Sequence, residues 1–139
     1  MKPIQNALSL LGSRTTRYPD HPDKAILETI PFSKNGNRFN VTLSTDEFTS
    51  LCPVTQQPDF GEIIIDYVPD KRLVESKSLK LYLFSFRNVG LFQESIVNRI
   101  LTDLKKALSP CSIRVTGRFK PRGGITLTPV AEWSKRSGR

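Results

Sequence analysis

The chain has 139 residues, enough for about one compact domain, and its 37% hydrophobic content can supply a core. Lys and Arg number 21 against 13 Asp and Glu, so the formal charge of +8 suits an anionic partner such as phosphate, nucleotide or nucleic acid. Two cysteines and one histidine exclude a disulfide framework and argue against a Cys/His zinc site. The longest apolar stretch is too short to span a membrane and no secretory leader is recognisable, so we expect a cytoplasmic protein.

Three regions differ in composition. Residues 1–24 contain three prolines and show no sustained helical or strand period, which predicts an N-terminal arm. Residues 25–133 carry the periodic apolar patterns and should form a single domain. Residues 134–139 are basic and predict a frayed tail.

The first part of the domain favours strands. Residues 25–30 and 38–44 have strand character, and the turn-forming residues 34–36 lie between them, which predicts an N-terminal hairpin. Residues 45–51 look like a short connection. They lead into a loop at 52–59 whose two prolines oppose regular structure.

The second part contains both strands and helices. Residues 60–68 alternate and are rich in isoleucine, which predicts a strand. Apolar residues then recur with helical spacing over 79–86 and 92–108. Residues 111–119 and 124–133 read as a closing hairpin.

The order of these elements indicates the fold class. Strands and helices that are grouped rather than alternating favour an α+β fold, with an antiparallel sheet and two helices packed on one face. A dinucleotide-binding domain of the Rossmann type is disfavoured. The glycine pair Gly123-Gly124 lies between strands and does not form a G-x-G-x-x-G fingerprint.

Cys52 and Asp59 are the first candidates for chemistry. A rigid proline-rich loop could hold a thiol and a carboxylate toward one cavity, as a nucleophile and a proton carrier require. A buried structural cysteine and a turn-forming aspartate would explain the same pattern. A reactive thiol needs a lowered pKa, and His21 is isolated in the N-terminal arm, so a Cys-His dyad is not favoured.

The remaining charged candidates are ambiguous from spacing alone. Lys77 and Lys80 lie three positions apart on a helical turn and could meet phosphate, although a solvated helix face is the simpler explanation. Glu94 suits the start of a helix through the helix dipole without any function. Arg122 is either an exposed turn residue or an anion contact.

Four segments together carry a resemblance to a known family. They are Cys52-Pro-Val-Thr-Gln-Gln-Pro-Asp59-Phe60, Glu75-Ser-Lys-Ser-Leu-Lys-Leu-Tyr82, Phe86-Arg-Asn88 and Pro121-Arg-Gly-Gly124. The chain resembles the QueF family of NADPH-dependent 7-cyano-7-deazaguanine reductases, in their short single-domain form, from about residue 25 to residue 133. The resemblance implies the tunnelling fold (T-fold), in which antiparallel sheets of several subunits join into a barrel. It therefore also implies a homo-oligomer with ligand sites at subunit interfaces.

The same resemblance implies a mechanism in queuosine biosynthesis, a tRNA modification. Cys52 would attack the nitrile of 7-cyano-7-deazaguanine to form a thioimide, Asp59 would carry the proton, and two hydrides from NADPH would give the aminomethyl base. The positions matched to binding of the base are Glu75, Ser76, Gln93 and Glu94. Those matched to the NADPH phosphates are Lys77, Lys80 and Arg122. No metal is implied: Cys111 is expected to pack as a small hydrophobic residue, although related cyclohydrolases bind zinc.

One departure from the family pattern leaves alternatives open. Gln93 precedes Glu94 where these reductases usually carry histidine, and Val89 stands where a second histidine is common. Glutamine cannot exchange a proton near neutral pH, so Asp59 or water would replace the imidazole. One alternative is a QueF-like enzyme that forms an amidine from ammonia on a nucleic-acid base, although the intact Lys77 and Lys80 argue against it. The other is a non-catalytic module that binds deazaguanine or nucleic acid.

Overall fold

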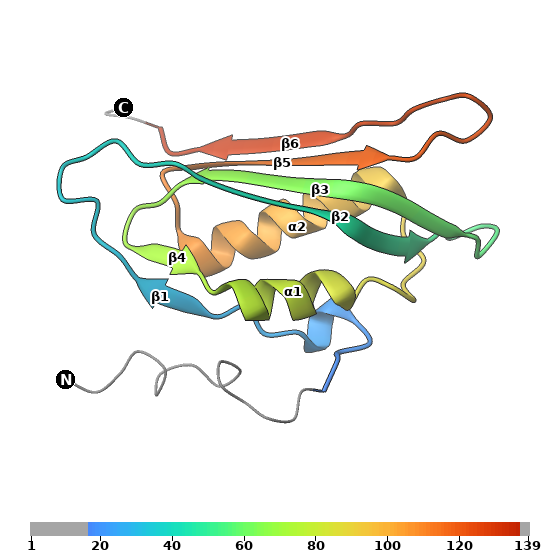
Figure 1. Cartoon of the computed structure of the whole chain (residues 1–139), viewed down its shortest axis with the longest axis horizontal. Helices are drawn as coiled ribbons and strands as arrows, with labels where there is room; N and C mark the ends of the chain where they lie inside the picture. The colour runs from blue at the N-terminus through green and yellow to red at the C-terminus, as the bar shows by residue number, and fades with distance from the viewer. Residues whose placement is uncertain (1–16, 137–139) are drawn as a thin grey trace.

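The computed structural model describes residues 17–136 and shows an α+β fold (Figure 1). Its strands and helices, in chain order, are β1 (Thr29–Pro31), β2 (Val41–Leu51), β3 (Pro58–Val68), β4 (Arg72–Val74), α1 (Ser76–Phe84), α2 (Gln93–Leu108), β5 (Ser112–Phe119) and β6 (Val130–Ser134). A four-stranded antiparallel sheet has the order β2-β3-β5-β6, and both helices lie on one of its faces. The predicted fold class, with two helices on one face of an antiparallel sheet, is confirmed.

Strand β3 is the centre of the sheet because it pairs with β2 on one side and β5 on the other. Its residues alternate strictly between buried and half-buried from residue 61 onward, so one face packs against the helices. Ile63, Ile65 and Tyr67 point to that face and are at most 1% exposed. The alternation that predicted this strand from the sequence is the pattern that builds the core.

Helix α2 seals the core with a continuous apolar stripe. Ile96, Ile100 and Leu104 are fully buried, and they pack with the inward-facing residues of β5. The helix ends at Ser109, whose left-handed φ of 44° stops helical hydrogen bonding just before Pro110. The predicted span of 92–108 is therefore confirmed to within one residue.

The predicted N-terminal hairpin is wrong. Residues 34–37 do form a turn, in which Asn37 N donates to Lys34 O, but the strands on either side do not pair with each other. Instead β1 pairs with β4, an element that the sequence did not indicate because it has only three residues. Pairing of β1 with β4 places the start of the domain beside the N-terminus of α1, where Glu75 N donates to Glu28 O.

Three further boundaries differ from the sequence prediction. Residues 45–51, expected as a connection, belong to β2, and a β-bulge between Thr45 and Phe48 explains why their alternation is broken. Strand β6 covers only Val130–Ser134 rather than 124–133, because residues 121–129 form an extended hairpin loop. Cys111 precedes β5 rather than opening it.

The ends of the domain are tied to its body. Arg99 of α2 forms ion pairs with Asp23, in the predicted arm, and with Asp103. The Asp103 carboxylate also accepts a hydrogen bond from the hydroxyl of the buried Tyr82 at 2.5 Å. Lys135 forms an ion pair with Asp70 at 2.9 Å. Residues 1–16 of the arm and 137–139 of the tail lie outside the described residues. Between residues 17 and 136, no helix has the length and apolarity needed to cross a membrane.

Candidate active site

Cys52 lies in a tight loop that joins β2 to β3. Cys52 N donates to Gln57 O at 2.8 Å and Gln56 N donates to Cys52 O at 3.0 Å, so the loop closes on itself. Gln56 adopts a left-handed φ of 61°, which lets the chain reverse within six residues. The loop is therefore held by its own backbone, with the half-buried Cys52 at its start.

The surroundings of Cys52 stabilise its thiolate. Hydrogen bonding from the Thr55 side chain, and then from the backbone N–H groups of Thr55 and Val54, lowers the pKa of Cys52 to about 7, with a smaller contribution from Arg122. A thiol with such a pKa is substantially ionised at neutral pH. No histidine is required for this activation.

Asp59 lies at the other end of the loop and faces the helix side of the sheet. Its side chain is only 5% exposed, and it forms an ion pair with Arg122. Its backbone oxygen accepts a hydrogen bond from Thr49 Oγ1 at 2.8 Å, which fixes the start of β3 against β2. Arg122 thus contacts both members of the pair Cys52 and Asp59, a link that the sequence did not indicate.

A two-residue turn positions Arg122. Arg122 N donates to Ile125 O at 3.0 Å and Ile125 N donates to Arg122 O at 2.9 Å, so these two residues close the turn. Gly123 and Gly124 have φ values of 55° and 77°, the left-handed values that a type I′ turn requires. Because Lys120 N donates to Phe60 O, the base of this hairpin is fixed beside the start of β3.

Ser50 is a candidate that the sequence prediction missed. It pairs with Asp59 in the register of β2 and β3, and directly paired residues of an antiparallel sheet point to the same face. Its side chain is fully buried, and within residues 17–136 its Oγ has no hydrogen-bond partner. A buried hydroxyl without a partner is costly and often marks a place where another group binds. Recognising β2 through Leu51 would have placed this serine beside the aspartate.

The start of α2 approaches the same loop. Residues 89–91 run alongside it: Leu51 N donates to Val89 O at 3.1 Å and Leu91 N donates to Leu51 O at 3.2 Å. A Cβ on Gly90 would lie 3.3 Å from Pro53 Cα, so the two segments are in close contact. Helix α2 begins two residues later, which places Gln93 and the exposed Glu94 at this end of the molecule.

Glu75 has a structural task in this chain. Its two carboxylate oxygens accept hydrogen bonds from Lys77 N at 2.7 Å and Ser78 N at 2.8 Å, so it caps the N-terminus of α1. The Ser78 hydroxyl accepts from Glu28 N and donates to Glu75 O, which links α1 to the segment before β1. Capping accounts for the position of Glu75 in the family motif without requiring a ligand.

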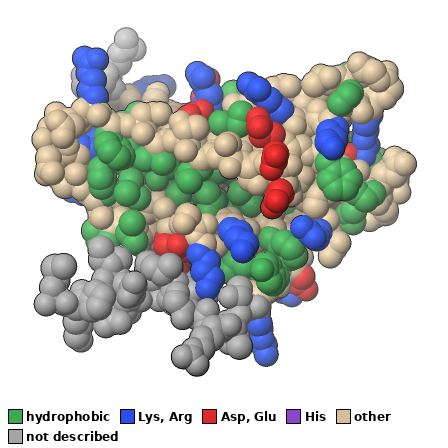
Figure 2. Space-filling model, viewed as in Figure 1, with side chains coloured by type: hydrophobic (Ala, Val, Ile, Leu, Met, Phe, Trp, Pro, Cys, Tyr) green, Lys and Arg blue, Asp and Glu red, His purple; other side chains and the backbone are tan. Residues whose placement is uncertain are grey.

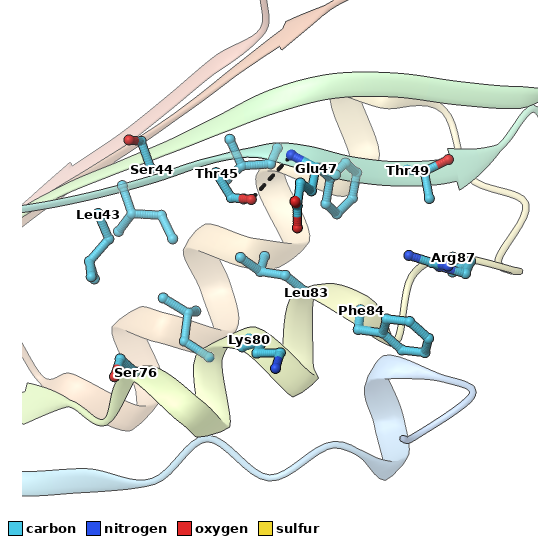
Figure 3. Close-up of a pocket in the computed structure, with 14 residues that line it drawn as sticks. Leu43, Ser44, Thr45, Glu47, Thr49, Ser76, Lys80, Leu83, Phe84 and Arg87 are labelled. Atoms are coloured by element: carbon cyan, nitrogen blue, oxygen red, sulfur yellow. Dashed lines mark hydrogen bonds between the residues drawn. The ribbon is translucent and has the colours of Figure 1, made fainter. Parts of the chain in front are cut away.

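Ser76 and Lys80 line a groove of about 260 Å³ between β2 and α1 (Figure 3). Figure 3 shows Lys80 projecting from α1 and Glu47 from the facing strand, with Arg87 just beyond the helix. In Figure 2 hydrophobic surface lies between these two elements, with Lys and Arg side chains over α1 and acidic ones over β2. An apolar floor with cations at its rim suits a ligand that joins a flat ring to an anionic group. Arg87 was not identified from the sequence.

The predicted site residues form two groups in one chain. Cys52, Asp59, Arg122, Gln93 and Glu94 gather where β2 meets β3 and α2 begins. Glu75, Ser76 and Lys77 lie at the opposite end of α1, a helix of nine residues and about 13 Å, with Lys80 between. The structure therefore places Cys52 and Asp59 in the same group but separates both from the first residues of the α1 motif.

Among the described residues, no three His, Cys, Asp or Glu side chains converge as a metal site would require. Cys111 is half-buried, with its Sγ 3.7 Å from Lys34 Nζ and 3.8 Å from Pro69 O. Its surroundings are polar as well as apolar, so the expectation of a purely hydrophobic packing role is only partly met.

Comparisons with known proteins identify the family of the chain. Residues 58–138 match the family model described as QueF-like protein. A Bacteroides thetaiotaomicron protein named NADPH-dependent 7-cyano-7-deazaguanine reductase is 50% identical over 97% of this chain and 89% of its own length. One of the same name from Exiguobacterium sibiricum is 49% identical over 94% of this chain and 80% of its own length. The crystal structure of the archaeosine synthase QueF-Like in the apo form gives a TM-score of 0.65 at 25% identity, covering 70% of this chain and 95% of that one.

Proposed function

Because the chain belongs to the QueF-like family, we propose that it is an NADPH-dependent 7-cyano-7-deazaguanine reductase of queuosine biosynthesis. The observation that carries this proposal is the 50% identity to a reductase of that name across 97% of the chain. The pairing of an activated thiol with a buried carboxylate supports it independently, because a nitrile is reduced most readily after capture by a nucleophile. We place the enzyme in the cytoplasm, where its two thiols stay reduced.

In the proposed mechanism Cys52 Sγ attacks the nitrile carbon and forms a thioimide. The thiol proton ends on the nitrile nitrogen, and Asp59 is the group placed to transfer it. When bound in turn, two NADPH molecules would supply the two hydrides that reduction of a nitrile to an amine requires, and Lys77, Lys80 and Arg122 would hold their phosphates. Two protons complete the reduction to the aminomethyl group, and Cys52 is released as a thiol. The protein orients the carbon and excludes water.

The binding residues are assigned to two surfaces. Gln93 and Glu94 lie at the Cys52 end, where the Glu94 carboxylate can accept the N1–H and 2-amino hydrogens of a guanine-like ring. Glu75 and Ser76 lie at the far end of α1 and contribute to the base site only from a neighbouring subunit. We assign Lys77, Lys80 and Arg122 to the NADPH phosphates.

This division of the site favours a T-fold homo-oligomer. Within residues 17–136, both outer strands of the sheet, β2 and β6, have no strand partner on one side. Joining such edges between copies would build a barrel and bring the α1 end of one subunit toward the Cys52 end of the next. The proposed oligomer therefore explains both the open edges and the separation of the two residue groups.

Gln93 defines where this enzyme should differ from its relatives. Its amide can orient a ligand by hydrogen bonding but cannot donate a proton as an imidazolium does. Asp59 is a buried carboxylate that Arg122 links to Cys52, so Asp59 or water must supply the protons for the reduction steps. A Gln93→His change that raises turnover would identify an imidazole as a useful additional acid.

The test is a coupled assay on the unmodified protein. With 7-cyano-7-deazaguanine present, NADPH should be oxidised with two equivalents consumed for each aminomethyl product. Without the nitrile, NADPH should persist. Binding of the base with no NADPH oxidation would reject the reductase.

A second candidate has one observation in its favour. The structural neighbour is an archaeosine synthase, and the expected chemistry of that class uses ammonia in place of hydride on the same thioimide. Supplying ammonia without NADPH separates the two reactions. Formation of an amidine with no NADPH oxidation would replace the reductase by this second function, whereas an amine formed at the expense of NADPH would exclude it.

A further inference from the structure

Arg122 contacts both Asp59 and Cys52. Its guanidinium forms an ion pair with the Asp59 carboxylate, which is 5% exposed, whereas the arginine side chain is 45% exposed. An arginine reserved for a phosphate would extend into solvent or into a cofactor groove. Here the side chain turns back across the ends of β3 and β5 and covers a buried acid.

The backbone around Arg122 is built to hold it there. The turn at Gly123-Gly124 requires two residues with left-handed backbone conformation. The two hydrogen bonds between Arg122 and Ile125 then fix the backbone of Arg122, which comes directly before the turn. The hydrogen bond from Lys120 N to Phe60 O anchors the hairpin beside Asp59. Both partners of the ion pair are therefore attached to rigid backbone.

We infer that Arg122 is a positioning residue for nitrile capture: through its ion pair it orients Asp59 beside Cys52, so that it acts on the thiol step and not only on the cofactor. This inference deepens the proposed function and rests on it for one of the two measurements below. The other measurement uses only the thiol and needs neither substrate nor cofactor.

The other neighbours of Cys52 leave this role to Arg122. The loop residues 53–57 carry no charge. The adjoining segment presents Val89 and Gly90, which are also uncharged. Arg122 of the hairpin forms an ion pair with Asp59 on β3 and also hydrogen-bonds to Cys52, so it is the charged group that links the thiol to the carboxylate. A further charged side chain at this end of the molecule, Glu94 at the start of α2, is exposed. Loss of the guanidinium would leave a buried carboxylate unpaired beside the nucleophile, which disfavours the thiolate.

The first measurement is alkylation of Cys52 by iodoacetamide as a function of pH, in a Cys111→Ser background. Reactivity should rise with pH as the thiolate forms, with a midpoint near 7. Arg122→Gln should move the midpoint upward and lower the rate at pH 7 about threefold. Arg122→Lys should recover part of the rate because it restores the charge. Arg114→Gln is the matched control, since it removes an arginine that is paired with Glu132 elsewhere on the sheet.

The second measurement is the rate of thioimide formation from 7-cyano-7-deazaguanine without NADPH. Arg122→Gln should slow it about tenfold, and the same change should add little in an Asp59→Asn background because both act through one carboxylate. Thermal unfolding of each variant reports whether the fold is retained. An unchanged alkylation profile and thioimide rate, with only the KM for NADPH raised, would overturn the inference. If the unmodified protein forms no thioimide, the proposed function fails, and the alkylation profile still decides the role of Arg122.

Discussion

The two cysteines lie near opposite ends of β3 and have the same half-buried exposure, yet their surroundings differ. Cys52 receives hydrogen bonds that stabilise its thiolate and lies near a buried carboxylate paired with Arg122. Cys111 Sγ lies 3.7 Å from Lys34 Nζ and donates to Pro69 O, and neither partner can take up and pass on a proton as a carboxylate can. The two thiols are thus distinguished by the loop hydrogen bonds and the nearby carboxylate of Cys52, and not by exposure.

Replacing the two cysteines should give the largest contrast. Cys52→Ala should lower nitrile reduction at least about 10³-fold because no other group can form the covalent intermediate. Cys111→Ser should leave the rate unchanged. NADPH oxidation in the presence of the nitrile measures both. Comparable losses in the two variants would mean that the environments do not assign the chemistry.

The two aspartates of β3 extend this contrast to the proton carrier. Asp59 is buried and paired with Arg122, whereas Asp66 accepts a hydrogen bond from Thr42 at 2.6 Å on the polar face of the sheet. Asp59→Asn should reduce turnover about 10²-fold because the amide cannot transfer a proton. Asp66→Asn can still accept the hydrogen bond from Thr42 and should leave the turnover unchanged. Steady-state rates distinguish them, and an active Asp59→Asn enzyme would exclude the carboxylate from the mechanism.

Two glycines offer a matched test of the hairpin turn. Gly124 and Gly36 have φ values of 77° and 79°, and a Cβ on either would meet nothing within 4 Å. Alanine at each should therefore cost a similar free energy of unfolding, about 1 kcal/mol. Gly124→Ala should in addition lower activity about fivefold by displacing Arg122. Urea unfolding and turnover check this, and equal activity in the two variants would separate the turn from catalysis.

Replacing Ser50 should give the smallest loss of turnover, and it should not destabilise the fold. Ser50→Ala removes a buried hydroxyl that has no partner, so the free energy of unfolding should stay the same or rise by up to about 1 kcal/mol. Turnover should nevertheless fall about twofold, because this hydroxyl lies opposite Asp59 and is available to a bound group. A variant that is more stable and fully active would show that Ser50 has only a packing role.

The sequence predicted those parts of the fold that depend on local patterns. Strand β3 and helix α2 carry clear periods of 2 and 3.6 residues, and both were located nearly to the residue. The pairing of β1 with β4 could not be predicted, since three-residue strands have no period and join segments more than 40 positions apart. Residues 45–51 of β2 were not predicted as a strand for a related reason. The bulge adds an extra residue and so breaks the alternation on which strand prediction relies.

For the site, the sequence indicated the candidate reactive residues but not which side chains contact one another. Cys52 and Asp59 were proposed from the loop and the family motif, and they lie at the two ends of a loop that closes on itself. The contact of Arg122 with Asp59 depends on the register of β3 with β5, which no local pattern encodes. Glu75 was assigned to the substrate from the motif alone, whereas its capping of α1 becomes visible only when the helix start is known.

The role of Cys52 as the nucleophile is tested most directly by the intact mass of the protein after mixing with 7-cyano-7-deazaguanine alone. We predict an increase equal to the mass of the whole nitrile, located on the peptide that contains Cys52 and absent from Cys52→Ala. Addition of NADPH should return the protein to its original mass as the amine is released. No mass increase, or an adduct on Cys111, would contradict the central claim that Cys52 is the activated nucleophile.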